Sequence, residues 1–150
     1  MIQFAGERTF PLPPDGLFAK LRDARFLVEC VPDSQVLGTP TETEGQCRVR
    51  PGFSFVRGSM DVTLSLKEAT PPGTLRWHLT SKGIGSSSVV ETVLHLKAAA
   101  SGTQVEWTAE VRELGGLLKI VPSGLIRGAA QKVIEDLWQG VTAKLGTPAP

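Results

Sequence analysis

The hydrophobic period of this sequence changes once, and that change limits the folds open to the chain. Between residues 34 and 112 apolar and polar residues mostly alternate, as they do in half-buried strands. After Gly116 apolar residues recur every three or four positions up to Leu145, which predicts one long amphipathic helix beginning near Pro122 or Ser123. That helix is the only apolar surface large enough to cover the strands. The pattern therefore predicts an antiparallel sheet curved around a single C-terminal helix.

The residues before this region predict one further strand and two short helices. Ile2 to Phe10 alternates imperfectly and indicates a strand, whereas Pro14 to Arg22 and Ala24 to Cys30 have helical spacing. Asp23 is placed to cap the second helix. With about six strands to follow, the chain is predicted to be an α+β domain with a sheet of about seven strands.

Two segments have patterns that need a local explanation. Phe53 to Lys67 is predicted as one long strand, but its two halves place apolar residues on opposite parity. A bulge near Gly58 would bring both halves onto one face. Gly83 to Ser88 is rich in glycine and serine and is predicted to be a flexible turn.

Length and charge exclude several classes of protein. The chain of 150 residues has the size of one domain, predicted over residues 1–147 with a short tail at 148–150. Its net charge of +1 argues against nucleic acid as a partner. No apolar run reaches the about 18 residues of a membrane span and no signal-peptide pattern is present, so a cytoplasmic location is predicted. Two Cys and two His, distant in sequence, do not make a four-ligand zinc site, and no metal or cofactor is predicted.

Short motifs along the chain, built from glycine, proline and apolar residues, carry a family resemblance. They are Phe4-Ala5-Gly6-Glu7, Phe10 to Pro14, Leu17 to Leu21, Cys30 to Asp33, Val56-Arg57-Gly58, Gly83-Ile84-Gly85 and Gly115 to Leu118. In this order they resemble the carbon monoxide dehydrogenase CoxG family of the START-like (SRPBCC) superfamily, over nearly the whole chain. The resemblance implies a helix-grip fold with an apolar cavity between sheet and helix. It also implies either carriage of a quinone or lipid, or recruitment of a molybdenum-containing carbon monoxide dehydrogenase to the membrane.

The inward parity of the strands and the apolar stripe of the helix define the residues that would line such a cavity. They are Phe53, Phe55, Met60, Val62, Leu64, Leu75, Trp77, Leu79, Thr92, Leu94, Val105, Trp107, Ile126, Ala130, Val133 and Leu137. Phe26 and Leu27 are predicted at its entrance. The alternative is that these side chains fill a solid core, and the resemblance favours the cavity. Thr92 is one of few polar groups inside, and Arg8 joins it if Phe4 faces inward.

The residues best suited to catalysis fall outside this inward set. His78 and His95 have the parity opposite to their apolar neighbours, which predicts that they face solvent. Cys30 and Cys47 have no histidine or basic cluster near them in sequence, and we interpret them as small buried hydrophobes. A cyclase or aromatase needs an inward ionisable group to move a proton. Non-catalytic binding is therefore predicted, with such an enzyme as the weaker alternative.

Trp77 and Trp107 mark the predicted ligand position, because a buried indole N–H needs a partner or water, which a partly open cavity supplies. Trp138 on the helix is predicted to be more exposed. The expected partner is an apolar small molecule, a quinone, isoprenoid or lipid. The second hypothesis is an accessory protein for a molybdenum hydroxylase-type dehydrogenase, with peripheral contact to the membrane. The identity of the ligand stays open.

Overall fold

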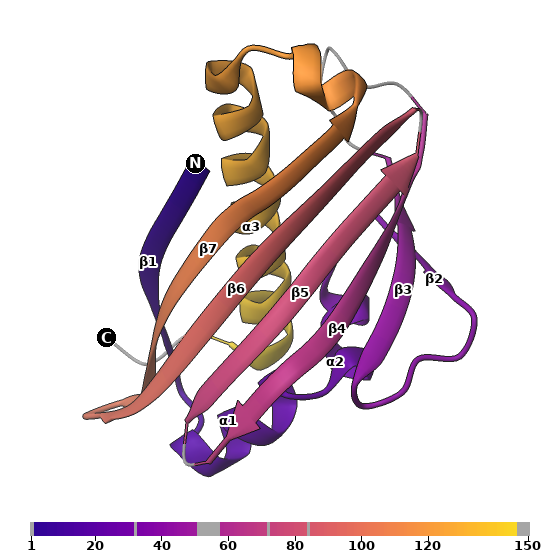
Figure 1. The fold of residues 1–150 in the computed structure, drawn as a ribbon. Coiled ribbons are helices and arrows are strands. Elements are labelled where there is room, and N and C mark those ends of the chain that lie inside the picture. Colours follow the sequence, from indigo (N-terminus) through magenta and orange to yellow (C-terminus); the bar gives the residue numbers. More distant parts are fainter. Residues whose placement is uncertain (1, 32, 51–57, 72, 84, 147–150) are drawn as a thin grey trace.

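The computed structural model describes residues 2–31, 33–50, 58–71, 73–83 and 85–146, and it places one curved sheet around one long helix (Figure 1). The seven strands pair antiparallel in the order β1-β7-β6-β5-β4-β3-β2. Their bounds are β1 (Ile2–Phe10), β2 (Gln35–Leu37), β3 (Glu44–Val49), β4 (Met60–Thr70), β5 (Thr74–Gly83), β6 (Ser86–Ala99) and β7 (Gly102–Gly116). The predicted antiparallel sheet is therefore confirmed.

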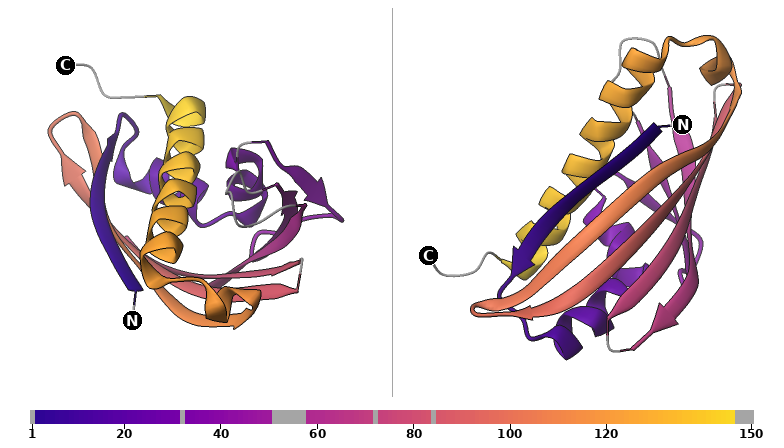
Figure 2. Two further views of the ribbon diagram at one scale, coloured as in Figure 1. Left: turned by 90° about the horizontal axis from the view of Figure 1, so that it is seen from above. Right: turned by 60° about the vertical axis from the view of Figure 1, so that its left-hand side comes forward.

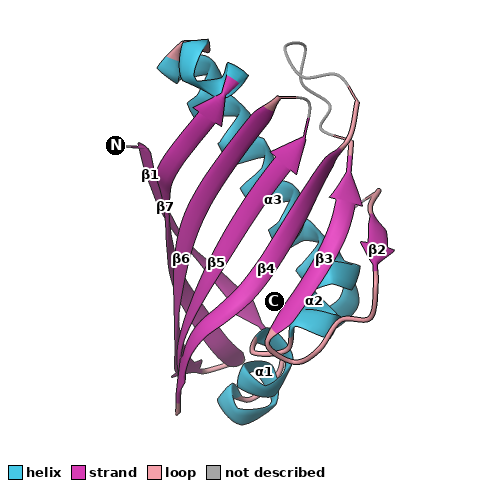
Figure 3. Cartoon of the chain, turned by 45° about the vertical axis from the view of Figure 1, so that its right-hand side comes forward, coloured by secondary structure: helices cyan, strands magenta, loops and turns pink. Residues whose placement is uncertain are grey.

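Helices lie on the concave side of this sheet. They are α1 (Pro14–Leu21), α2 (Ala24–Cys30), the short 3₁₀ helix η1 (Leu117–Ile120) and α3 (Ser123–Leu145). Both views in Figure 2 show α3 crossing the concave face, and Figure 3 shows α2 behind β3. The Asp23 side chain accepts a hydrogen bond from the Arg25 backbone N–H at 2.9 Å, so it caps α2 as predicted. The sequence pattern did not predict η1.

Two local predictions need correction or fall outside the described residues. Ser86, Ser87 and Ser88 are not part of a flexible turn, because they are the first residues of β6 and pair with Gly83, Lys82 and Ser81 of β5. A run of serines tolerates a strand where the pairing partner supplies the backbone hydrogen bonds. The first part of the predicted long strand, including Phe53 and Phe55, lies outside the described residues.

The core gathers where α1 and α2 meet the sheet. Phe10, Leu17 and Leu75 are fully buried, and they come from β1, α1 and β5. The Trp138 ring on α3 lies 6.1 Å from that of Phe10. Residues far apart in the sequence thus close one end of the space between sheet and helix, and α3 is attached at that end.

The rotation of α3 about its axis differs from the prediction. Ile126 is buried as predicted, but Val133 is 51% exposed, and Trp138 is buried at 7% exposure instead of being the exposed indole. The apolar residues of α3 cover more than one side, so their spacing alone leaves its rotation open. The contact with Phe10 and the core turns Trp138 inward, and Val133 is left at the helix flank.

A glycine lets α3 approach α2 closely. A Cβ placed on Gly140 would lie 1.8 Å from the backbone oxygen of Cys30, which ends α2. No side chain fits there unless one helix moves. By contrast, a Cβ on Gly128, also in α3, would meet nothing within 4 Å.

Replacing each of these two glycines with alanine should therefore have opposite effects. Gly140→Ala should destabilise the fold by about 1–3 kcal/mol, the usual effect of overpacking. Gly128→Ala should stabilise it by about 0.5–1 kcal/mol, because alanine is the better helix former. Urea unfolding monitored by circular dichroism measures both. Equal stability of the two variants would contradict the α2–α3 contact.

Candidate functional site

The middle of the concave face is apolar but incompletely covered. Leu64 on β4, Leu79 on β5 and Val90 on β6 form a cross-strand row. Leu64 is buried, whereas Leu79 and Val90 are only half-buried. Val62 and Leu66 on β4 are also half-buried, although they have the inward parity of Leu64. Covering is therefore complete near α1 and α2 and partial elsewhere on this face.

The position of α3 accounts for this uneven cover. Gln131 lines a groove beside β1. Val133, two residues further, points to nearly the opposite side of the helix, because successive residues turn by about 100°. The exposure of Val133 shows that the side of α3 away from β1 is not buried against the sheet. One flank of the helix and the half-buried sheet residues thus both offer apolar surface.

The predicted lining residues divide into groups in the structure. Buried ones are Met60, Leu64, Leu75, Trp77, Leu94, Val105 and Ile126, together with Leu27, which was expected at an entrance. Half-buried ones are Val62, Leu79, Thr92, Trp107, Ala130 and Leu137, together with Phe26. Val133 is exposed, and Phe53 and Phe55 lie outside the described residues. The half-buried group is the part of the prediction that remains available to a ligand.

The two predicted marker tryptophans have different surroundings. The Trp77 Nε1–H donates to the backbone oxygen of Leu21 at 3.1 Å, and this side chain is 2% exposed. Its partner is thus the end of α1 and not a ligand or water, which corrects the expectation. Trp107 is half-buried, and its Nε1 has no hydrogen-bond partner among the described residues. Trp107 is therefore the better-placed ligand reporter of the two.

A groove that the sequence pattern did not predict lies between β1 and α3. It has a volume of about 530 Å³, and its walls include Phe4, Arg8, Trp107, Arg127 and Ile134. Arg8 has the inward parity of Phe4 and Phe10, which confirms the condition set for it from the sequence. The groove depends on the register between β1 and β7 and on the position of α3. Only the suspicion about Arg8 pointed toward it.

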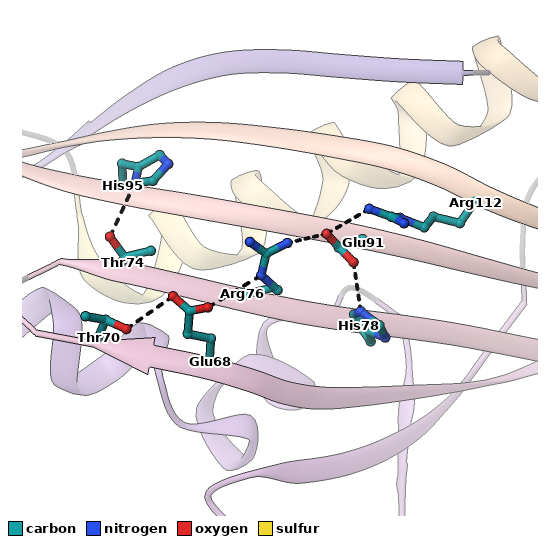
Figure 4. A network of polar contacts seen from close by, with 8 residues as sticks. All are labelled: Glu68, Thr70, Thr74, Arg76, His78, Glu91, His95 and Arg112. Carbon is teal, nitrogen blue, oxygen red and sulfur yellow. Dashed lines mark hydrogen bonds and ion pairs between the residues drawn. The ribbon is translucent and has the colours of Figure 1, made fainter.

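The convex face of the sheet holds the main charged network (Figure 4). Glu91 on β6 accepts from Arg76, from His78 Nε2 at 2.9 Å and from Arg112 at 3.1 Å. Its side chain is only 11% exposed. Burial alone would raise the pKa of Glu91, but the hydrogen bond from His78 and the charges of Arg112 and Arg76 outweigh it and lower that pKa.

Both histidines thus lie on the outer face, as predicted. His95 is exposed and lies 3.4 Å from the Thr74 hydroxyl, whereas His78 is held by Glu91. The network joins β5, β6 and β7 across the convex surface. Its side chains are on the opposite side of the sheet from α3, so it supports the sheet and does not face the inner space.

The family model for CoxG, a protein of the carbon monoxide dehydrogenase system, matches residues 6–146 of this sequence. The chain belongs to the CoxG family. No curated protein matches it in sequence. The resemblance seen in the short motifs is confirmed over nearly the full length.

Solved structures confirm the helix-grip fold of this CoxG-family chain. A conserved protein from Geobacillus kaustophilus has a TM-score of 0.81 at 19% identity, with 96% of this chain and 95% of that chain covered. The AHSA1 protein from Silicibacter pomeroyi has a TM-score of 0.66 at 15% identity, with 96% and 97% covered. A protein from Rhodobacter sphaeroides has a TM-score of 0.61 at 15% identity, with 95% and 91% covered. At these identities the likeness concerns the fold.

The thiols of this CoxG-family chain are not poised for reaction. Cys30 and Cys47 are both buried, and burial raises the pKa of each thiol to about 11. Both are therefore protonated at neutral pH and lack the thiolate that nucleophilic attack requires. Within the described ranges, His, Cys, Asp and Glu form no group of three suited to a metal ion. No helix of the described part is long and apolar enough to span a membrane.

Glu91 should make the stability of the fold depend on acid pH. Because the folded pKa lies below the usual value of 4.5, the contribution of the ionised group is present above about pH 4.5 and is lost as pH falls through the lower folded pKa. Glu91→Gln should lower stability at pH 7 by about 1–3 kcal/mol, since its cationic partners lose a charged acceptor.

Calorimetry of wild type and Glu91→Gln between pH 7 and pH 3 tests this dependence. The difference in Tm should shrink as pH falls below 4.5. Exposed Glu113 on the neighbouring strand provides the control Glu113→Gln, for which we expect little change at any pH. A Glu91→Gln difference that stays constant down to pH 3 would contradict the electrostatic account.

Proposed function

We propose that this chain is a non-catalytic binding or carrier protein for an apolar small molecule, a quinone, isoprenoid or lipid. The ligand would lie between the concave face and α3. The observation that carries the proposal is the half-buried apolar surface of Val62, Leu66 and Leu79 facing a helix whose Val133 flank is exposed. Ligand sites are typically concave and mostly apolar, with few polar groups.

The dimensions of the elements support this proposal. Seven strands spaced about 4.8 Å apart would span about 29 Å if they were flat, whereas a helix with its side chains is about 10–12 Å wide. One long helix therefore covers only part of the concave face. The short helices α1 and α2 cover one end, where the core is closed. The rest of the apolar surface would be covered by a ligand.

The location of polar groups favours a carrier over a cyclase-type enzyme. Described inward positions around Leu79 carry apolar or hydroxyl side chains, such as Val90, Ser81 and Thr92. The Ser81 and Ser88 hydroxyls bond to one another. Neutral hydroxyls can orient a carbonyl or hydroxyl of a ligand, but they are weak groups for moving a proton at neutral pH.

Charge introduced at Leu79 should abolish ligand binding. Leu79→Lys would place an ammonium group on the concave face at a half-buried position, so we expect the affinity for a menaquinone analogue to fall at least about tenfold. Thr80→Lys, the next residue and on the opposite face, is the matched control and should bind as wild type does. Leu94 is a poor test position, because at 4% exposure it belongs to the core.

Titration with menaquinone analogues and long-chain fatty acids measures this effect through indole emission and Tm. Saturable binding should raise the Tm of wild type and of Thr80→Lys. Melting curves also show whether Leu79→Lys remains folded. Equal binding by the two lysine variants, or no saturable binding of any apolar ligand by wild type, would contradict the proposed function.

A second candidate function is peripheral contact with a membrane, in the service of a partner enzyme. Five large apolar residues are exposed within the described chain, and four of them are Leu117, Ile120, Leu125 and Val133. Residues 114–134 contain Lys119, Arg127 and Lys132 and no acidic residue. Exposed apolar side chains among basic ones are typical of proteins that bind anionic lipid surfaces. The family name adds a link to carbon monoxide dehydrogenase, whose recruitment such contact would serve.

Vesicle co-sedimentation tests this second candidate. Wild type should bind vesicles of equal parts phosphatidylglycerol and phosphatidylcholine more tightly than vesicles of phosphatidylcholine alone. The double variant Leu117→Ser/Ile120→Ser should lose at least about tenfold in vesicle affinity, because two apolar side chains no longer enter the lipid. Val36→Ser, at the exposed apolar residue on β2, is the control. Equal loss in both variants would contradict a membrane role for η1.

A further inference from the structure

The groove between β1 and α3 contains cationic and N–H donor groups that no anion compensates. Arg8 comes from β1, Arg127 from α3 and the Trp107 indole from β7, and all three line the same groove. Neither arginine forms an ion pair with a described residue, and the indole Nε1 has no partner among them. Three donors from three elements therefore meet in one place.

Gly6 brings the Trp107 indole to the wall of the groove. Gly6 lies directly opposite Trp107 in the β1–β7 register. A Cβ on Gly6 would lie 2.7 Å from Cζ2 of the indole and 3.0 Å from its Nε1. The ring thus occupies the space that a side chain at this position would fill. A buried N–H without a partner costs about 1–3 kcal/mol, and a ligand acceptor would recover that free energy.

The two arginines are held in place without being neutralised. Arg127 donates to the backbone oxygen of Gln3 at 3.3 Å, and its guanidinium lies 5.3 Å from the centre of the Phe4 ring. Both contacts leave the positive charge uncompensated. Arg8 is half-buried and has the same inward parity as Phe4.

The carboxylates at the groove have other partners. Glu7 accepts from Gln104 at 2.8 Å, and Glu135 accepts from Gln131 at 3.3 Å. Glu7 has the parity opposite to Arg8, so its side chain points to the convex side of the sheet. The groove therefore has two uncompensated guanidinium groups against one exposed carboxylate, Glu135.

We propose that this groove binds the oxyanion headgroup, carboxylate or phosphate, of an amphiphile. This inference rests on the proposed carrier function and names the polar end of its ligand. Arg8 and Arg127 hold the anion from opposite walls, and the Trp107 N–H supplies a third donor. Guanidinium groups suit this role because they offer paired donors to carboxylate or phosphate oxygens. The apolar chain lies along Phe4 and Ile134 toward the space between sheet and helix.

Matched ligands separate the headgroup from the chain. Calorimetric titration with dodecanoate, dodecyl phosphate and dodecanol presents one chain length with a carboxylate, a phosphate or no charge. Wild type should bind at least one of the two anions about tenfold or more tightly than the alcohol. The tighter of the two anions assigns the headgroup.

Variants locate the effect in the groove. Arg8→Gln/Arg127→Gln should lower the affinity for the preferred anion at least about tenfold and leave that for dodecanol within about twofold. Trp107→Phe keeps an aromatic ring but removes the N–H, and it should weaken anion binding alone. Lys132→Gln removes a charge from the exposed part of the same helix and should leave both affinities unchanged.

The outcomes distinguish this inference from the proposed function. Saturable binding of all three ligands with equal affinity would overturn the anion site and keep the carrier function. An anion preference that survives in Arg8→Gln/Arg127→Gln would overturn the assignment of the arginines. Failure of wild type to bind any of the three, or any quinone analogue, would overturn the carrier function and with it this inference.

Discussion

The structure depends on how one helix covers the concave face of a wide sheet. The sheet curves toward α3, and α3 is attached at one end by Trp138 against Phe10 and by the close approach of Gly140 to the end of α2. Those contacts fix the helix over the side of the sheet near β1, and the short helices close the adjoining end. What remains is apolar surface on β4, β5 and β6 that is half-buried. The proposed ligand space is therefore a consequence of the same packing that stabilises the fold.

Charge is arranged differently on the two faces. On the convex side Glu91 is fully engaged by cations from β5 and β7, and it holds three strands together. On the concave side, near β1, Arg8 and Arg127 have no such partner among the described residues. An arginine that is compensated stabilises the protein itself, whereas an arginine that is uncompensated in a groove is available to an incoming anion. This difference distinguishes supporting residues from candidate binding residues.

Much of the architecture could be predicted from the sequence, because alternation and helical spacing are local signals. The parity of Leu75 and Trp77, the Asp23 cap and the long final helix follow from neighbours within a few residues. The partners of side chains could not be predicted in this way. The Trp77 indole bonds to Leu21, which is 56 residues away, and Glu91 collects cations from two other strands. The candidate site shows the same limit. Spacing placed Ile126 and Val133 on one stripe, but tertiary contacts turned α3 so that Trp138 is buried and Val133 exposed. The groove beside β1 exists only because Gly6 faces Trp107 across strands that are distant in sequence.

The central claim is that apolar surface between the sheet and α3 is covered by a ligand. Native mass spectrometry of the protein purified gently from a bacterial host tests this claim most directly. The account predicts an additional mass that organic extraction removes and that is identified as a lipid, quinone or isoprenoid. Protein purified in the same way that shows only the mass of its polypeptide would contradict it.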